Sequence, residues 1–315
     1  MRCGYNQLNQ LNLSTNIALQ NLDCFNNQLT SLNVSNNADL QYLACFYNQL
    51  TSLDLFNNVA LKSLSCGGNP LTFLNITNCI ALSILNCYND DLPFLDISHN
   101  SNLKYLSCRY NQLTALDLSN NFALEGLECD NNQLTALDMS NNLILRNLDC
   151  GENLLNQLNL VNNTALTYLR CRSNLLNQLN LVNNTALISL QCQINPNLTC
   201  IQVWDTTYAY GQTTTGYFGI DPTMYFSLDC SNAIDIENAN SSFSFSPNPV
   251  SDYLSLSYTG GRNFSFIISD ISGRTLVEGI DKKQISISLV SLPVGIYFLT
   301  AQIGDKKVIK KFIKE

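Results

Sequence analysis

Residues 103–123 read LKYLSCRYNQLTALDLSNNFA, and this 21-residue stretch decides most of the fold. Its cysteine recurs every 21 residues without a slip, at positions 3, 24, 45, 66, 87, 108, 129, 150, 171 and 192. Leucine stands five positions before every one of these cysteines from Cys24 onward, and apolar residues follow each cysteine from Cys3 to Cys171 at plus five, plus eight and plus ten. A constant period with constant apolar positions indicates a solenoid in which each turn packs on the next.

Two apolar alternations within each turn predict its strands. The residue two before the cysteine and the cysteine itself are apolar and enclose a variable residue, so a short parallel strand with leucine and cysteine inward is predicted there. A second alternation, at plus eight and plus ten, predicts a strand on the opposite wall. About five residues remain between the walls, too few for a two-turn helix, so the solenoid is predicted to be mostly β.

Asparagine occupies the corners of the repeat. It stands three residues after the cysteine in nine turns, and Asp90 is the exception. A side-chain amide can pair with both a backbone N–H and a backbone C=O, so we expect these residues to form a ladder from turn to turn. Asp90 lacks the amide donors and is predicted to be locally solvated or a weak point.

The unit LxxLxCxxNxLxxLxLxxNxx resembles the leucine-rich repeat, with cysteine in place of its third leucine. The resemblance covers residues 1–196 and implies a right-handed leucine-rich-repeat solenoid with short parallel strands. Residues 197–237 carry the aromatic side chains expected of a C-terminal cap, in which Cys230 is placed to form a disulfide with Cys200. Because the chain starts in mid-repeat, we expect its N-terminus to be incomplete.

Composition excludes several classes of function. The formal net charge is −8, and one histidine makes His-based catalysis and multi-histidine metal sites improbable. The acidic balance is a poor match for nucleic acid, and no apolar run is long enough for a transmembrane segment. Residues 1–240 carry a net −11 and residues 241–315 a net +3, which suggests two domains.

Two columns of side chains invite a metal or cofactor hypothesis, which we do not favour. The ladder cysteines lie one per turn along a line, so we expect buried thiols rather than a metal site, with occasional disulfides as an alternative. Asp96, Asp117 and Asp138 form an outward column nine residues after the cysteine. We expect a solvated acidic stripe there, with a divalent cation as the alternative. No cofactor is predicted.

The outward positions of the predicted strands are the candidate ligand-binding surface. Aromatic and charged side chains gather there in chain order: Phe25, Tyr42, Phe46, Tyr88, Tyr105, Arg109, Glu128, Asp130, Asp149, Arg170 and Arg172. Exposed aromatics and arginines on a rigid surface are typical of interaction hot spots. Stacking between neighbouring strands that only supports the sheet explains the aromatic residues equally well.

After residue 237 the period changes from 21 to two. Seven candidate strands, at 243–246, 253–258, 263–269, 274–279, 284–289, 295–303 and 307–313, predict a small antiparallel immunoglobulin-like β-sandwich over residues 238–315. The signatures Phe245-Ser-Pro-Asn-Pro249 and Leu292-Pro-Val-Gly-Ile-Tyr297, followed by a lysine-rich terminus, resemble the C-terminal sorting domain of type IX secretion substrates. The matching residues are Pro247, Asn248, Pro249, Gly295, Tyr297, Lys310 and Lys311.

The sorting resemblance implies the type IX machinery as a partner and export to the surface or medium of a Gram-negative bacterium. Such substrates carry a signal peptide, which this sequence lacks. The sequence thus predicts a secreted or cell-surface leucine-rich-repeat protein that binds a protein or glycan ligand, adhesin-like and not an enzyme. The alternatives are a hydrolase or carbohydrate-active enzyme using outward carboxylates such as Glu128 with Asp149, and a purely structural surface spacer.

Overall fold

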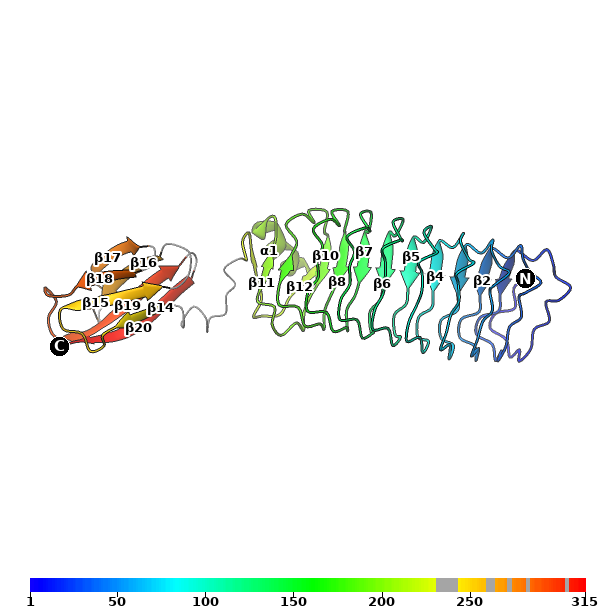
Figure 1. Cartoon of the computed structure of the whole chain (residues 1–315), viewed down its shortest axis with the longest axis horizontal. Helices are drawn as coiled ribbons and strands as arrows, with labels where there is room; N and C mark the ends of the chain where they lie inside the picture. Colours follow the sequence, from blue (N-terminus) through cyan, green and yellow to red (C-terminus); the bar gives the residue numbers. More distant parts are fainter. Residues whose placement is uncertain (231–242, 259–263, 271–273, 282–283, 304–305) are drawn as a thin grey trace. The chain divides into compact units, whose positions relative to one another are not determined.

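The computed structural model describes residues 1–230, 243–258, 264–270, 274–281, 284–303 and 306–315. The chain divides into two compact units, Met1–Cys230 and Ser231–Glu315. The first is a solenoid of short parallel strands, and the second is built from two antiparallel sheets (Figure 1). The predicted fold class, a mostly β solenoid followed by a small antiparallel β domain, is confirmed.

One short strand per turn builds the main sheet of the solenoid. Equivalent residues of successive turns pair in parallel, as Leu22 does with Leu43, so the 21-residue period of the sequence is also the register of the sheet. The sheet has ten strands in the order β1-β2-β3-β4-β5-β6-β7-β8-β10-β12. Their bounds are β1 Asn21–Asp23, β2 Tyr42–Ala44, β3 Ser63–Ser65, β4 Ile84–Asn86, β5 Tyr105–Ser107, β6 Gly126–Glu128, β7 Asn147–Asp149, β8 Tyr168–Arg170, β10 Ser189–Gln191 and β12 Phe218–Gly219.

The core of the solenoid consists of the leucine columns and the cysteine ladder. Leu64 and Cys66, for example, have no exposed surface, and the same holds for almost every equivalent pair. Side chains at the strand positions on either side of the leucine face outward. The alternation predicted from the sequence therefore sets which residues are available to a ligand.

The corner asparagines form the predicted ladder. Asn48 is typical: its Oδ1 accepts the backbone N–H of Leu29, while its Nδ2 donates to the carbonyl oxygens of Cys24 and Cys45. Each such amide satisfies three buried backbone groups in two adjacent turns. This explains why asparagine, not another polar residue, fills a column that is closed to water.

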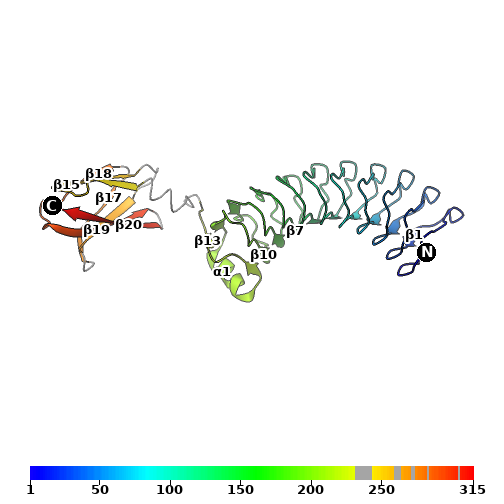
Figure 2. The same ribbon diagram turned by 90° about the horizontal axis from the view of Figure 1, so that it is seen from below.

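The prediction of a second strand in each turn, at plus eight and plus ten, was wrong for almost all turns. Within residues 1–230, strands form at these positions only as β9 (Leu179–Asn180) and β11 (Cys200–Gln202), which join β13 (Tyr225–Ser227) in a three-stranded sheet. Elsewhere, in Figure 2, the loops fan apart on the side away from the main sheet. The leucines at these positions are buried nonetheless.

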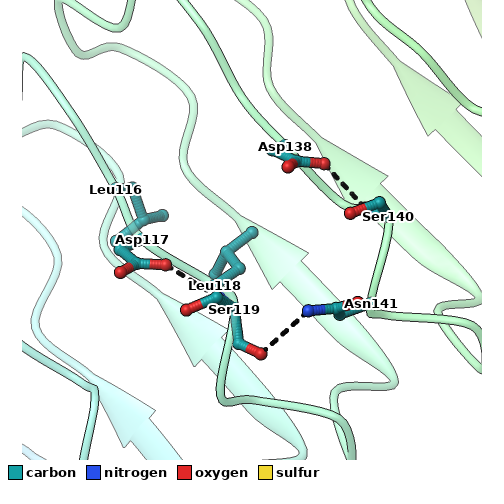
Figure 3. Close-up of a pocket in the computed structure, with 7 residues that line it drawn as sticks. All are labelled: Leu116, Asp117, Leu118, Ser119, Asp138, Ser140 and Asn141. Carbon is teal, nitrogen blue, oxygen red and sulfur yellow. Dashed lines mark hydrogen bonds between the residues drawn. The ribbon is translucent and has the colours of Figure 1, made fainter.

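Local hydrogen bonds turn the backbone directly after these positions. The Asn or Asp at plus nine accepts the backbone N–H two residues later, as Asp117 does from Ser119 and Asp138 from Ser140 (Figure 3). The backbone then turns at once, because the N–H of Asn121 donates to the carbonyl of Leu118. The same bonds follow β9, where Asn180 accepts the N–H of Val182, so they fix the turn but do not by themselves exclude a strand.

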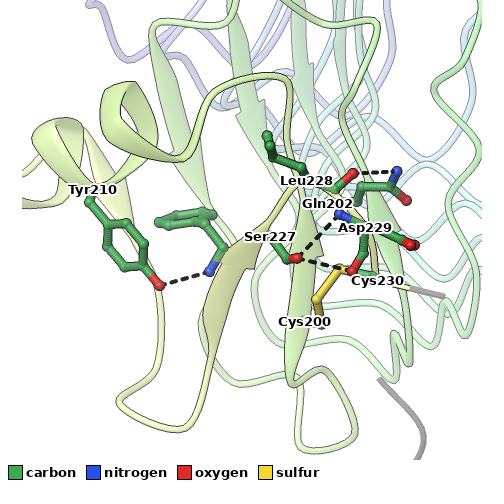
Figure 4. Close-up of a disulfide and its surroundings, with 8 residues drawn as sticks. Cys200, Gln202, Tyr210, Ser227, Leu228, Asp229 and Cys230 are labelled. Atoms are coloured by element: carbon green, nitrogen blue, oxygen red, sulfur yellow. Dashed lines mark hydrogen bonds between the residues drawn. A yellow bond between two sulfur atoms is a disulfide. The ribbon is translucent and has the colours of Figure 1, made fainter. Parts of the chain in front are cut away.

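A cap closes the C-terminal end of the solenoid. Its helix α1 (Thr206–Thr215) starts at Asp205, whose Oδ1 accepts the N–H groups of Thr207 and Tyr208. The buried face of α1 covers β12 and β13, and the hydroxyl of Tyr210 accepts the N–H of Phe226. A disulfide joins Cys200 on β11 to Cys230, as the sequence suggested (Figure 4).

The second unit contains two antiparallel sheets around one core. The three-stranded sheet has the order β14-β15-β18 and the four-stranded sheet the order β17-β16-β19-β20. The bounds are β14 Phe243–Ser246, β15 Tyr253–Tyr258, β16 Phe264–Ser269, β17 Thr275–Asp281, β18 Gln284–Ser288, β19 Gly295–Ile303 and β20 Lys306–Lys314. Alternate residues of both sheets, such as Leu256, Ile268 and Phe312, form the core. In the described part of the chain, no helix is long and apolar enough to cross a membrane.

Candidate binding surface

Each strand of the main sheet that leads into a ladder cysteine is followed by the same backbone turn. The residue two after the ladder cysteine has a positive φ in every turn, between 50° and 69°. Only Gly68 is glycine; Tyr5, Tyr47 and Tyr110 occupy the same column, although a bulky side chain is strained in this region. This column, which the sequence analysis did not single out, adds a second row of side chains beside the predicted surface.

Aromatic side chains from both rows form one continuous ladder. Phe25 stacks on Phe46 at 4.5 Å between ring centroids, and Tyr5 meets Phe25 edge-on at 5.1 Å. Phe46 contacts Tyr47, which contacts Tyr88 at 6.0 Å. Tyr5 and Tyr47 were missed in the sequence, where only their place in the repeat could have indicated them.

Glycines make room for this ladder. A Cβ at Gly67 would lie 2.4 Å from the carbonyl oxygen of Tyr88, and one at Gly68 would lie 2.3 Å from the ring of Tyr47. Tyr47 and Tyr88 thus meet across the turn that carries the Gly67-Gly68 pair. Burial and the hydrogen bond with Tyr47 raise the pKa of Tyr88 to about 12, so its hydroxyl stays protonated.

Tyr42 and Tyr105, the other two predicted aromatics, lie outside this ladder. They are the first residues of β2 and β5 and are 49% and 45% exposed. The Tyr105 hydroxyl donates a long hydrogen bond, 3.4 Å, to Glu125. Phe25, Phe46 and Tyr88 are half-buried by comparison. Of the predicted aromatic residues, these two tyrosines offer the most surface to a ligand.

The charged half of the surface begins where the ladder ends. The guanidinium of Arg109 lies 5.5 Å from the ring centroid of Tyr88, and its Nη1 lies 3.8 Å from Oε2 of Glu128. The hydroxyl of Ser107 donates to the same oxygen at 2.9 Å. The aromatic and charged halves are therefore physically connected through Arg109.

Further along the sheet, opposite charges alternate rather than form separate patches. Arg170 Nη1 lies 3.2 Å from Asp149 Oδ2, and Arg172 pairs with Glu152, which the sequence analysis did not name. Burial, reinforced by the charge of Asp130, raises the pKa of Asp149. Asp130 is only 6% exposed and accepts a hydrogen bond from Asn131.

The carboxylates of the hydrolase alternative lie on neighbouring strands. Glu128 on β6 pairs in register with Asp149 on β7, and each has an arginine partner. The single histidine, His99, lies elsewhere on an exposed turn, where its Nδ1 is 3.0 Å from the hydroxyl of Ser98. That hydroxyl donates to Asp96, so the histidine does not link serine to carboxylate as in a hydrolytic triad.

The thiols of the cysteine ladder are enclosed. Burial raises the pKa of every ladder thiol, to about 12 at Cys24 and Cys108. Cys3, in the first turn, is the one free cysteine that is half-exposed, and all cysteines lie within described residues. Among the described residues, no group of three or more His, Cys, Asp or Glu side chains is arranged to hold a metal ion.

In the second unit, three separate sequence signatures meet at one corner. The side-chain oxygen of Asn248 accepts the backbone N–H of Ile313 at 2.9 Å, next to a backbone bond from Val250 N to Ile313 O. Tyr297 stacks on Phe312 at 5.6 Å, and its hydroxyl donates to the carbonyl of Pro293. Gly295 lies opposite Lys314. The Pro-Asn-Pro segment thus holds the end of the terminal strand.

Residues 244–315 match the family described as the secretion system C-terminal sorting domain. The second unit is a sorting domain. Its presence implies that the chain is secreted or carried to the cell surface. Pro247, Asn248 and Pro249 border the end of the last strand of this sorting domain, and Lys310 and Lys311 lie on that strand. A comparison with curated proteins gave no match.

Solved structures that are similar to this chain are leucine-rich-repeat proteins. The functional domain of InlJ from Listeria monocytogenes, described as including a cysteine ladder, is 24% identical, with a TM-score of 0.63 over 100% of this chain and 85% of InlJ's. A leucine-rich-repeat protein of Leptospira interrogans is 21% identical, with a TM-score of 0.50 over 65% of this chain and 61% of its own. The ectodomain of the Arabidopsis thaliana receptor kinase GASSHO1/SCHENGEN3 is 21% identical, with a TM-score of 0.50 over 59% of this chain and 27% of its own. These similarities show the leucine-rich-repeat fold, and no enzyme family is indicated.

Proposed function

We propose that the protein is an adhesin-like binding protein, exported to the outer surface or surroundings of a Gram-negative bacterium, whose solenoid binds a protein ligand. The observation that carries this proposal is the outward face of the main sheet, where exposed Tyr42 on β2 and Tyr105 on β5 are followed along the sheet by charged pairs. Amphipathic tyrosines beside arginines are typical of protein interfaces. The Arabidopsis ectodomain of the same fold was solved in complex with CASPARIAN STRIP INTEGRITY FACTOR 2.

The geometry of the aromatic ladder favours a protein over a glycan. Sugar rings pack against the face of an aromatic side chain. In the ladder one face of Phe25 and one of Phe46 are covered by the stacking of the two rings, and Arg109 lies over Tyr88. We therefore assign the ladder a supporting role in the sheet and assign ligand contact to Tyr42, Tyr105 and the charged residues.

The full chain should be tested on arrays of extracellular matrix proteins and glycans, followed by affinity measurement for each hit. Tyr42→Ala and Tyr105→Ala are each expected to weaken binding to a protein hit by about tenfold, since central aromatic anchors carry most interface energy. Phe122→Ala is the matched control, because Phe122 is 58% exposed but lies outside the strands.

Three outcomes would contradict this function. Hits confined to glycans would overturn the choice of ligand. Equal losses in the Phe122 control would show that the strand face has no special role. Absence of any partner, together with unchanged surface display, would favour the structural spacer.

A further inference from the structure

The two outer sheet faces of the sorting domain differ in composition. Among the outward side chains that the structure describes on the β14-β15-β18 sheet, all but Tyr253 at the start of β15 are serines: Ser244, Ser246, Ser255, Ser257, Ser286 and Ser288. Registers such as Ser255 with Ser286 place these serines side by side across strands. This serine face is what a solvated outer sheet face requires, and it shows that the fold does not need apolar residues there.

The outer face of the β17-β16-β19-β20 sheet carries polar residues such as Glu278 and Thr300, but also a cluster of apolar side chains. Ile296 on β19 pairs directly with Ile313 on β20, and they are 46% and 40% exposed. Two residues along, half-buried Phe298 pairs with Lys311, and Ile267 on β16 is 38% exposed. We call Ile296, Phe298, Lys311 and Ile313 the terminal-strand patch. Adjacent apolar residues on an exposed sheet face mark an interaction surface.

The patch is held rigid from its other side. Tyr297 and Phe312, which alternate with the patch residues on β19 and β20, stack inside the core. The side chain of Asn248 accepts the N–H of Ile313, which adds a contact that holds the end of the last strand. A partner would therefore meet a preorganised surface and would lose little affinity to ordering.

We propose that the terminal-strand patch is the surface by which the sorting domain docks on a protein of the secretion machinery. The partner surface is apolar and bordered by carboxylates, because Lys311 lies in the patch and residues 241–315 carry a net charge of +3. The inference rests on the proposed export of the chain. It adds that a folded sheet face, not only a linear terminal sequence, is recognised.

Export of the full chain, carried behind a signal peptide in a bacterium with a type IX system, tests this inference. Surface-exposed protein would be measured by protease accessibility, and retained protein by immunoblotting of the periplasm. Ile296→Glu is expected to lower the exported fraction by about tenfold or more, because it places a charge in an apolar contact. Ser286→Glu is the matched control, since it places the same charge on the serine face, and it should be exported normally.

Two further variants keep the outcomes distinct. If Ile296→Glu is exported poorly but also melts at a lower temperature, Lys311→Glu decides, since it reverses an exposed charge and should still reduce export. Deletion of residues 243–315 tests the sorting function itself. If the deletion abolishes export while Ile296→Glu and Lys311→Glu are exported like the control, the patch is not the docking surface. If the deletion has no effect, the proposed export route is wrong as well.

A second copy of the chain is the competing occupant of the patch. Sedimentation of the purified full chain would reveal a dimer that Ile296→Glu dissociates. Such a dimer, combined with normal export of the variant, would overturn the proposal in favour of self-association.

Discussion

At the scale of single residues, Asp90 departs from a rule that nine other turns obey. It is 6% exposed, and its Oδ1 accepts the N–H of Asn69, but its buried Oδ2 has no hydrogen-bond partner. The amide that would donate to the neighbouring cysteine carbonyls is missing. Burial, reinforced by the charge of Asp91, raises the pKa of Asp90 to about 7. Asp90 also interacts electrostatically with other titratable groups, namely the thiols of Cys45, Cys66 and Cys87 and the hydroxyl of Tyr88.

This raised pKa predicts a pH-dependent stability. Between its unfolded value, 3.8, and about 7, Asp90 is protonated in the folded state and ionised in the unfolded state. The folded state binds more protons, so its stability falls as pH rises through this window. Asp90→Asn should raise the free energy of unfolding at pH 8 by about 1–3 kcal/mol and remove this dependence, as measured by urea denaturation.

The equivalent asparagine of another turn provides the control. Asn132→Asp should introduce the same loss of stability between pH 4 and pH 8, because Asn132 donates to the carbonyls of Cys108 and Cys129. A wild-type protein whose stability does not fall from pH 5 to pH 8 would contradict this account of Asp90.

At the scale of elements, the aromatic ladder and the cysteine ladder both connect the solenoid strands. Phe46→Ala should lower the free energy of unfolding by about 1–3 kcal/mol, since it removes a half-buried ring that stacks on Phe25. Tyr105→Ala should cost less than about 1 kcal/mol, because its ring is largely exposed. Thermal unfolding of both variants checks this. The reverse order would mean that the exposed tyrosines, not the ladder, support the sheet.

The cysteine ladder should be chemically inert while the solenoid is folded. Of the eleven free cysteines, ten are buried, and burial raises their pKa, so little reactive thiolate is present. A thiol reagent at pH 8 should modify Cys3 quickly and the other ten only after unfolding. Rapid reaction of most thiols under native conditions would contradict the burial.

The stability of the cap depends on its disulfide. The bond between Cys200 and Cys230 closes a loop of 30 residues that contains α1, β12 and β13. Cys230→Ser should lower the stability of the cap by about 2–4 kcal/mol, since the unfolded loop gains conformational entropy. Hydrogen exchange should locate the loss in residues 200–227, and reduction of the wild type should reproduce it. Protection that is unchanged in that segment would show that packing alone holds the cap.

At the scale of the whole molecule, the two units have different roles. The solenoid is acidic and presents a rigid sheet face, and the sorting domain is basic and carries the export signatures. Each unit has a core of its own, so a change in one is expected to leave the folding of the other intact. Because the two units fold independently, variants of the sorting domain are expected to change export and to leave ligand binding by the solenoid unchanged.

The amino-acid sequence by itself determined the features that depend on periodicity. The 21-residue spacing sets the parallel register, the inward leucines and cysteines and the asparagine ladder, because each turn repeats the same local contacts. The period of two in the last 75 residues likewise located the seven strands of the sorting domain. Both patterns are local, so they are legible in the chain without knowledge of the fold.

Only the tertiary structure decided what lies between turns and between distant segments. The apolar pattern predicts a second strand in every turn, but among residues 1–230 only β9 and β11 pair at these positions. Tyr47 joined the aromatic ladder because a left-handed turn and the space at Gly68 direct its ring toward Tyr88. Asn248 and Ile313 meet across 65 residues. Such contacts depend on packing in three dimensions, which no periodicity along the chain encodes.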